Sequence, residues 1–196
     1  MDLTNFYSND IFKECVSTLK ETSKDNNGKS VEYMTESKVE VIDFDKVKEK
    51  YIKDKNIPGT PKSNDVLLIN SEDDLYFIEF KNGSLRKRSD QGELSAKNRD
   101  SVLIFLDIIK RDLEFTRKNL TYILVYNENK NPSYEGESDF IQESPSRSLI
   151  GKKIASKANK EIIRFGLDIF KNYLFKDVHT YTKDEFNDKN ILKLTK

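Results

Sequence analysis

The sequence has little of the residue types that build disulfide frameworks and zinc sites. Among its 196 residues, Cys15 is the single cysteine and His179 the single histidine. One cysteine cannot form an intrachain disulfide, and one cysteine with one histidine cannot supply the four ligands of a structural zinc site. Because this cysteine usage is typical of a reducing compartment, we expect a cytoplasmic protein.

Long apolar runs and an excess of charge of one sign are also lacking. No apolar stretch approaches the ~20 residues that a membrane-spanning helix needs, and the start of the chain lacks the basic and apolar regions of a signal peptide. We therefore expect a soluble protein with no membrane partner. The 34 basic and 34 acidic side chains cancel, so any basic surface that attracts nucleic acid must be local.

The chain does contain enough apolar sequence for one core. It is 36% hydrophobic and 11% aromatic, which at this length predicts a single domain over residues 1–196. Helical spacing of apolar residues predicts helices over residues 9–22, 45–52, 93–115 and 149–175, the last interrupted near Gly166. Apolar runs predict strands over residues 38–44, 65–69, 75–81, 120–126 and 178–181. This order predicts an α/β fold, a mixed β-sheet flanked by helices, with a C-terminal helical extension over about residues 147–196.

The two runs at residues 65–69 and 75–81 predict a hairpin that carries charges inside an apolar strand. Glu79 and Lys81 share one face of that strand, because side chains alternate across it. Acid-x-lysine triplets also occur at residues 36–38 and 128–130. The triplet of Glu79, Phe80 and Lys81 stands out by its surroundings, since ionised side chains in a buried strand cost several kcal/mol unless they are paired or bound to a metal.

Asp65 opens the preceding strand of the same hairpin. One register of the hairpin sets Asp65 directly across from Glu79, with Cβ atoms about 5 Å apart. A register shifted by one residue sends the two carboxylates to opposite faces. If they are adjacent, they repel unless a cation lies between them, and oxygen ligands without Cys or His favour Mg²⁺ or Mn²⁺. Such a metal polarises a phosphoryl oxygen and activates water, which Lys81 would orient or deprotonate.

Asp65 followed at hairpin distance by Glu79-Phe80-Lys81, then by a long helix and a buried strand, resembles the core of the PD-(D/E)XK nuclease superfamily. The resemblance covers about residues 38–126, and Asn64 stands where the motif has proline. It implies a restriction-endonuclease-like fold in which Asp65 and Glu79 hold Mg²⁺ or Mn²⁺, the Phe80 carbonyl adds a ligand, and Lys81 supports the attacking water. Many members add a glutamate from the first helix, for which Glu14 and Glu49 are both candidates.

Several basic and polar residues outside the hairpin are candidates for contacts with phosphate groups. They are Arg86, Lys87, Arg88, Lys97, Ser101, Lys152, Lys153 and Lys157. Lys97 and Ser101 lie one turn apart on the predicted long helix, and the alternative is that residues 97–100 form a solvated helix face. Residues 147–176 hold eight basic against two acidic side chains, which indicates a local basic surface for nucleic acid or simply a lysine-rich surface helix.

The sequence thus predicts a metal-dependent nuclease that hydrolyses phosphodiester bonds, with DNA favoured over RNA as substrate, in defence or mobile-element biology. The intact set of Asp65, Glu79 and Lys81 favours this enzyme. The alternative is a catalytically inactive protein of the same fold that acts as a binding, immunity or regulatory factor, which the zero net charge favours. Whether the chain forms a homodimer or binds a protein partner stays open.

Overall fold

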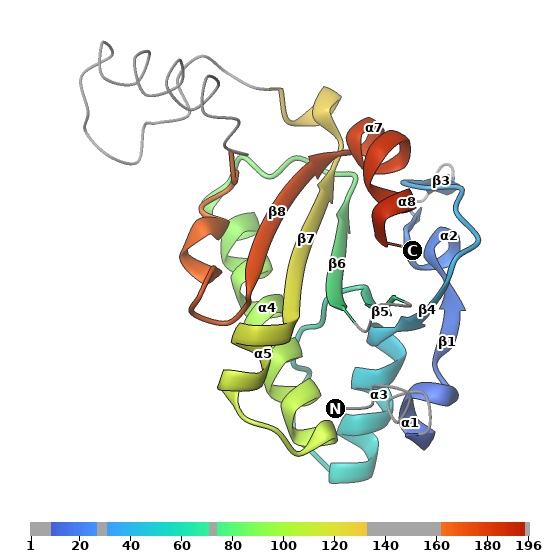
Figure 1. The fold of residues 1–196 in the computed structure, drawn as a ribbon, viewed down its shortest axis with the longest axis vertical. Helices are drawn as coiled ribbons and strands as arrows, with labels where there is room; N and C mark the ends of the chain where they lie inside the picture. Colours follow the sequence, from blue (N-terminus) through green and yellow to red (C-terminus); the bar gives the residue numbers. More distant parts are fainter. Residues whose placement is uncertain (1–8, 27–30, 71–73, 133–161, 195–196) are drawn as a thin grey trace.

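A six-stranded mixed sheet lies at the centre of the protein, and helices cover both of its faces (Figure 1). The structure is a computed structural model that describes residues 9–26, 31–70, 74–132 and 162–194. The strands of the sheet, in spatial order, are β1 (Val16–Thr18), β4 (Glu40–Asp43), β5 (Val66–Ile69), β6 (Leu75–Lys81), β7 (Leu120–Tyr126) and β8 (Asp177–Thr182). The predicted mixed α/β architecture is confirmed.

The direction of the strands changes at β6. Neighbours from β1 to β6 are antiparallel, whereas β7 runs parallel to β6 and β8 runs parallel to β7. The predicted hairpin is therefore the β5–β6 pair, and β7 is the buried, internal strand that its continuous apolar run predicted. A separate two-stranded sheet of β2 (Lys24–Asn26) and β3 (Val31–Tyr33) lies near the C-terminal helices, where Lys183 donates to the Tyr33 carbonyl at 2.9 Å (Figure 1).

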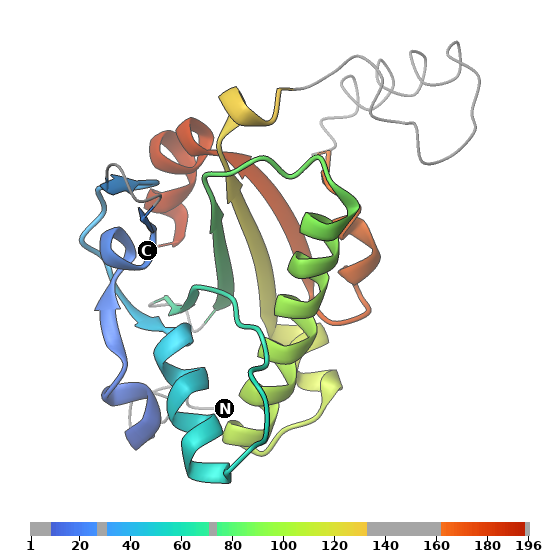
Figure 2. The same ribbon diagram turned by 180° about the vertical axis from the view of Figure 1, so that it is seen from behind.

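Two long helices flank the hairpin on one face of the sheet (Figure 2). The helices are α1 (Asp10–Lys13), α2 (Leu19–Thr22), α3 (Phe44–Lys55), α4 (Arg88–Ile109), α5 (Leu113–Asn119), α7 (Lys183–Glu185) and α8 (Ile191–Leu194), with single turns η2 (Glu128–Lys130), η3 (Leu167–Phe170) and η4 (Phe186–Asn190). The Asp43 carboxylate caps α3 by accepting from the Lys46 amide at 3.2 Å. Asn56 and Lys110, both with positive φ, end α3 and α4.

Aromatic packing fixes α3 and α4 against β6. The ring of Phe77 on β6 meets Phe44 of α3 edge-on at 4.8 Å between centroids, and meets Phe105 of α4 at 5.7 Å. Side chains alternate along β6, so Glu79 and Lys81 point to this same face, between the two helices. On the other face, Phe80 packs edge-on against Phe186.

The predicted first helix over residues 9–22 is wrong in its middle. Only residues 10–13 and 19–22 are helical, and Val16–Thr18 forms β1, which pairs with β4. A backbone hydrogen bond extends the pairing of β1 with β4 by one residue, because the Asp43 amide donates to the Cys15 carbonyl at 2.8 Å. Cys15 is nevertheless buried. Pairing with a neighbouring strand has overridden the helical spacing of apolar residues.

The predicted helix over residues 149–175 is wrong for the part that the structure describes. Residues 162–175 contain only the single turn η3. Phe165, Gly166 and Asn172 all have positive φ, which a right-handed helix cannot accommodate. Beyond this segment, β8 joins the main sheet, and Thr182 and Glu185 form a capping box at the start of α7. The expected C-terminal extension is thus only partly helical.

Two boundaries near the hairpin also differ from the prediction. The long helix begins at Arg88 and ends at Ile109, earlier than expected at both ends, so Arg88 belongs to α4 and not to a loop.

Among the described helices, none combines the length and the apolar character needed to cross a membrane.

Candidate functional site

The site is built on the register of the β5–β6 hairpin. Val66 lies opposite Ile78, and one further step along the two strands sets Asp65 across from Glu79. A hydrogen bond fixes this end of the hairpin, since the Phe80 amide donates to Asp65 Oδ2 at 2.7 Å. Of the two registers that the sequence allows, the structure has the one that brings the two carboxylates to the same face.

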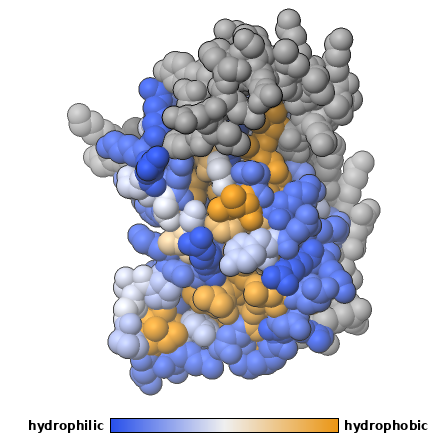
Figure 3. All heavy atoms as spheres, turned by 90° about the vertical axis from the view of Figure 1, so that its left-hand side faces the viewer, coloured by the Kyte–Doolittle hydropathy of each residue, from blue (hydrophilic) through white to orange (hydrophobic). Residues whose placement is uncertain are grey.

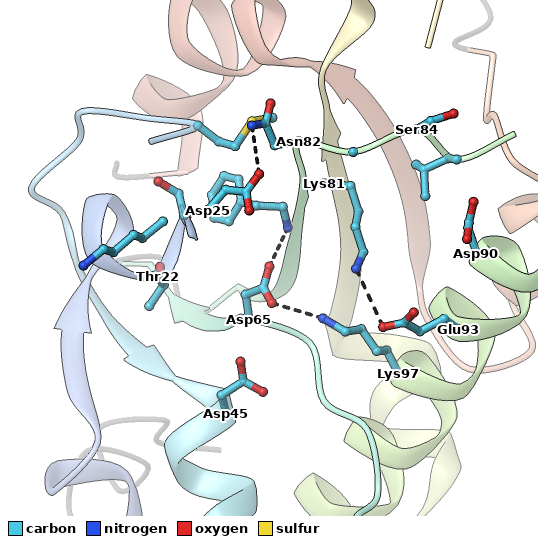
Figure 4. Close-up of a pocket in the computed structure, with 16 residues that line it drawn as sticks. Thr22, Asp25, Asp45, Asp65, Lys81, Asn82, Ser84, Asp90, Glu93 and Lys97 are labelled. Atoms are coloured by element: carbon cyan, nitrogen blue, oxygen red, sulfur yellow. Dashed lines mark hydrogen bonds and ion pairs between the residues drawn. The ribbon is translucent and has the colours of Figure 1, made fainter. Parts of the chain in front are cut away.

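Two lysines converge on Glu79, which is fully buried. Lys97 Nζ lies 2.6 Å from Glu79 Oε1, and Lys81 Nζ lies 3.3 Å from the same oxygen. Lys97 also reaches Asp65, with Nζ 3.2 Å from Oδ1 (Figure 4). The ammonium group of Lys97 therefore bridges the two carboxylates, while the second oxygen of Glu79, Oε2, is buried without a hydrogen-bond partner.

Burial controls the ionisation of this cluster. Removal from water, together with the neighbouring charge of Asp65, raises the pKa of Glu79 to about 8, although Lys97 and Lys81 oppose the shift. Burial also raises the pKa of Asp65, against the attraction of Lys97. For Lys97, burial lowers the pKa, but the charges of Glu79 and Asp65 outweigh it and hold the pKa above its usual value. Lys97 is thus the cation of the cluster at neutral pH.

The cluster opens into a cleft of about 350 Å³. Its lining includes five carboxylates, Asp25, Asp45, Asp65, Asp90 and Glu93, and three lysines, Lys24, Lys81 and Lys97 (Figure 4). Lys81 points into this space from β6 towards Glu93 of α4, at 3.9 Å. The excess of acids makes the cleft attractive to cations and repulsive to a bare phosphodiester.

Asp45 is an acidic group of the cleft that sequence reasoning missed. It belongs to the first turn of α3, accepts a hydrogen bond from Ser63, and lies 3.2 Å from Lys48. Its charge contributes to the raised pKa of Asp65. The two expected helix acids differ from it: Glu14 pairs with Lys50, and Glu49 is exposed on α3 one turn beyond Asp45. Asp45 reaches the cleft because α3 lies beside the hairpin, and the sequence alone does not specify that position of α3.

Ser101 is not a surface residue that contacts phosphate. It is fully buried on α4, and its hydroxyl accepts a hydrogen bond from the backbone amide of Asn64 at 2.7 Å. One turn earlier, the Asn98 side chain accepts from the Asn64 side chain at 3.1 Å. These contacts hold the residue before Asp65 against α4. Asn64, which replaces the proline of the motif, is therefore a structural contact of the site.

Of the other candidate phosphate contacts, three lie close to the cleft and three lie outside the described residues. Arg86, Lys87 and Arg88 are exposed next to Ser84 and Leu85, which line the cleft. Lys152, Lys153 and Lys157 lie outside the described residues.

The described basic residues of the C-terminal segment have protein partners. Arg164 donates to the Tyr126 hydroxyl at 2.9 Å and to the Asn131 carbonyl at 3.0 Å. Lys171 and Lys176 pair with Asp177 and Asp74. Figure 3 shows hydrophobic patches among hydrophilic residues on the side of the molecule where this segment lies, and its large exposed hydrophobic side chains are Ile162, Ile169 and Tyr173.

The donor chemistry of the cleft suits a divalent metal ion, but a complete ligand cage is not formed. Asp65 and Glu79 offer hard oxygen donors; Asp65 lines the cleft, whereas Glu79 is fully buried and its Oε2 has no hydrogen-bond partner. Within the described part of the chain, no three His, Cys, Asp or Glu side chains are arranged to hold a metal. None of the protein families, curated proteins and solved structures compared with the chain matches it.

Proposed function

We propose that this chain is a metal-dependent nuclease with the restriction-endonuclease-like fold of the PD-(D/E)XK superfamily. The observation that carries the proposal is that Asp65, Lys81 and Lys97 line one cleft, while the fully buried Glu79 contacts both of these lysines. The arrangement of elements supports it, because the hairpin β5–β6 leads into α4 and then into β7, parallel to β6.

Asp65 and Glu79 would hold Mg²⁺ or Mn²⁺, with the Phe80 carbonyl as the further ligand that the family resemblance implies. Bound there, the ion would supply Lewis acidity towards a phosphoryl oxygen. The cleft has more acids than lysines in its lining, so added cations are needed before it can admit a phosphodiester of DNA or RNA.

Lys81 is suited to act on the reacting groups themselves. Its ammonium group is partly exposed to the cleft, between Glu79 at 3.3 Å and Glu93 at 3.9 Å. From there it would orient an attacking water or neutralise the negative charge that develops on the phosphate. Glu79 would hold Lys81 in this position through the same oxygen that contacts Lys97.

One observation favours the alternative, a binding or regulatory protein with this fold and without the chemistry. The ammonium groups of Lys97 and Lys81 already contact the two carboxylates, so the cluster is also a structural network of ion pairs. In that case these side chains stabilise the junction of α4 with the hairpin, and the cleft is not used for hydrolysis.

Cleavage assays with wild type and Glu79→Gln separate the two functions. Plasmid DNA, single-stranded DNA and RNA are incubated with the full chain in Mg²⁺, Mn²⁺ or EDTA. A nuclease cleaves one of these substrates only with metal, and Glu79→Gln lowers the rate by roughly 100-fold or more. Glu128→Gln is the matched control, because Glu128 belongs to the same kind of triplet but is exposed on η2. Absence of cleavage and of metal binding by wild type would leave the regulatory protein.

A further inference from the structure

Lys97 occupies the position between Asp65 and Glu79 in which the sequence predicts a metal ion. Its Nζ lies 3.2 Å from Asp65 Oδ1 and 2.6 Å from Glu79 Oε1, and its side chain is 13% exposed. Two carboxylates on one face of a buried hairpin repel each other when both are ionised, and a cation between them relieves that repulsion. In this structure the cation is part of the protein.

We propose that Lys97 and a divalent metal ion compete for Asp65 and Glu79, so that metal binding displaces the Lys97 ammonium into the cleft. The inference rests on the proposed metal site. An ammonium group and a divalent cation in contact with the same carboxylate oxygens repel each other strongly in a poorly solvated site. The two ions therefore exclude each other, and the metal-free protein is the state in which Lys97 closes the site.

The two lysines at Glu79 differ in a way that singles out Lys97 as the competitor. Lys97 contacts both carboxylates, whereas Lys81 contacts Glu79 alone and has Glu93 as its second neighbour. Lys81 is also more exposed, at 24% against 13% for Lys97. Loss of Lys81 would remove one positive charge near Glu79 but would leave the bridging position occupied.

The surroundings of Lys97 allow its side chain to move while its backbone stays fixed. Asn98 and Ser101, on the same helix, are buried and bound to Asn64, so this part of α4 is anchored. Lys97 itself lines the cleft, and its four-carbon side chain can rotate into that space. The displaced ammonium would then lie where a phosphate group enters, and metal binding would turn an internal counter-ion into a contact for substrate.

Metal affinity of matched lysine variants provides the first test. Mn²⁺ binding is measured by calorimetry and by the rise in melting temperature for wild type, Lys97→Met, Lys81→Met and Lys24→Met. All three lysines line the cleft. We expect Lys97→Met to bind Mn²⁺ roughly tenfold tighter than wild type or more, within the usual range of coupling between two ligands. Lys81→Met gains less, and Lys24→Met gains least, because Lys24 adds to the charge of the cleft but is not paired with Asp65 or Glu79 in the described part of the chain.

Wild-type protein provides the second test, which holds even if Lys97→Met fails to fold. Reductive methylation followed by mass spectrometry measures the reactivity of each lysine with EDTA and with Mn²⁺. Lys97 is expected to be protected in EDTA and to become several-fold more reactive with Mn²⁺. Lys62, which is 55% exposed and lies 3.9 Å from Glu93, serves as the internal standard with constant reactivity.

The outcomes distinguish failure of this inference from failure of the proposed function. Mn²⁺ binding to wild type with Lys97 still protected, or an equal gain for Lys97→Met and Lys81→Met, would overturn the competition while leaving the metal site intact. No Mn²⁺ binding to wild type or to any variant would overturn both. Increased reactivity of Lys97 together with the larger gain for Lys97→Met supports the competition.

Discussion

Lys97 of α4 contacts Glu79 of β6 at 2.6 Å, and so joins a helix to a buried strand that is 18 residues earlier in the chain. The contact places a positive charge at the wall of the cleft, next to the fully buried Glu79. Asp65 contacts the same ammonium group. Loss of either carboxylate would leave the Lys97 charge without one of its partners, which would destabilise the packing of α4 on the hairpin. The site and the packing of α4 on the sheet therefore depend on each other.

The stability of the metal-free protein should fall as the pH rises from about 5 to about 8. Burial and Asp65 raise the pKa of Glu79 from 4.5 to about 8 in the folded chain. Between these values the folded state holds a proton that the unfolded state has lost, so rising pH favours unfolding, by at most about 1.4 kcal/mol per pH unit for one group. Urea unfolding in EDTA across this range measures the slope.

Glu79→Gln is the control for this pH dependence. Glutamine does not titrate, so the variant should show a flatter curve than wild type between the same pH values. Carboxylates with lowered pKa, such as Asp107 with a pKa of about 2, lose their contribution only at lower pH and do not mask the effect. Parallel curves for wild type and Glu79→Gln would show that Glu79 is ionised in the folded state throughout the range.

Ser101→Ala should destabilise the fold although it removes only one oxygen atom. The substitution leaves the buried Asn64 amide without its acceptor at 2.7 Å, which costs about 1–3 kcal/mol. Ser95→Ala is the matched control on the same helix, since its hydroxyl donates to the Gln91 carbonyl of the preceding turn and holds no separate segment against α4 in the described part of the chain. Denaturant unfolding compares the two variants. Equal, small effects would mean that the Ser101 contact contributes nothing to stability.

The sequence predicted the elements that form the site better than it predicted their contacts. The apolar runs of β5, β6 and β7 and the charges of Glu79 and Lys81 were evident, because strand alternation is a local property. The register was left open between two alternatives, since the residues of β5 are all apolar and buried on both faces. In the register that the structure has, the Phe80 backbone amide donates a hydrogen bond to Asp65 Oδ2.

Long-range packing explains what the sequence did not reveal. Asp45 and Lys97 reach the cleft because α3 and α4 pack against Phe77 from either side, and the spacing within each helix gives no information about this. Ser101 was a candidate phosphate contact, and its burial was missed for the same reason. One signal was available for Lys97: two adjacent buried carboxylates require a nearby cation, and a lysine of the following helix was the simplest source.

Asp45→Asn should weaken metal binding without unfolding the protein. The carboxylate lies in the cleft near Asp65 and adds to its negative potential, while an asparagine can still accept the hydrogen bond from Ser63. We expect the Mn²⁺ affinity to fall roughly tenfold, equivalent to about 1.4 kcal/mol. Glu49→Gln, one turn further along α3 and exposed, should leave the affinity unchanged. Calorimetry measures both, and equal affinities would remove Asp45 from the site.

Lys81→Met should abolish turnover while preserving metal binding. In the proposed nuclease, Lys81 acts on the water or on the developing charge of the phosphate, so its loss should lower kcat by roughly 100-fold or more. Its removal also takes a positive charge away from Glu79, so Mn²⁺ binding should not weaken. Single-turnover cleavage and calorimetry on the same preparation measure the two quantities.

Lys62→Met is the matched control for Lys81→Met. Both lysines lie 3.9 Å from Glu93, but Lys62 is 55% exposed and contacts neither Asp65 nor Glu79. Cleavage by Lys62→Met should match wild type, which would show that the effect of Lys81→Met does not come from the freed Glu93. If Lys81→Met cleaves as fast as wild type, Lys81 has no part in the reaction. If instead both turnover and Mn²⁺ binding are lost, Lys81 is a structural partner of Glu79, as the regulatory alternative requires.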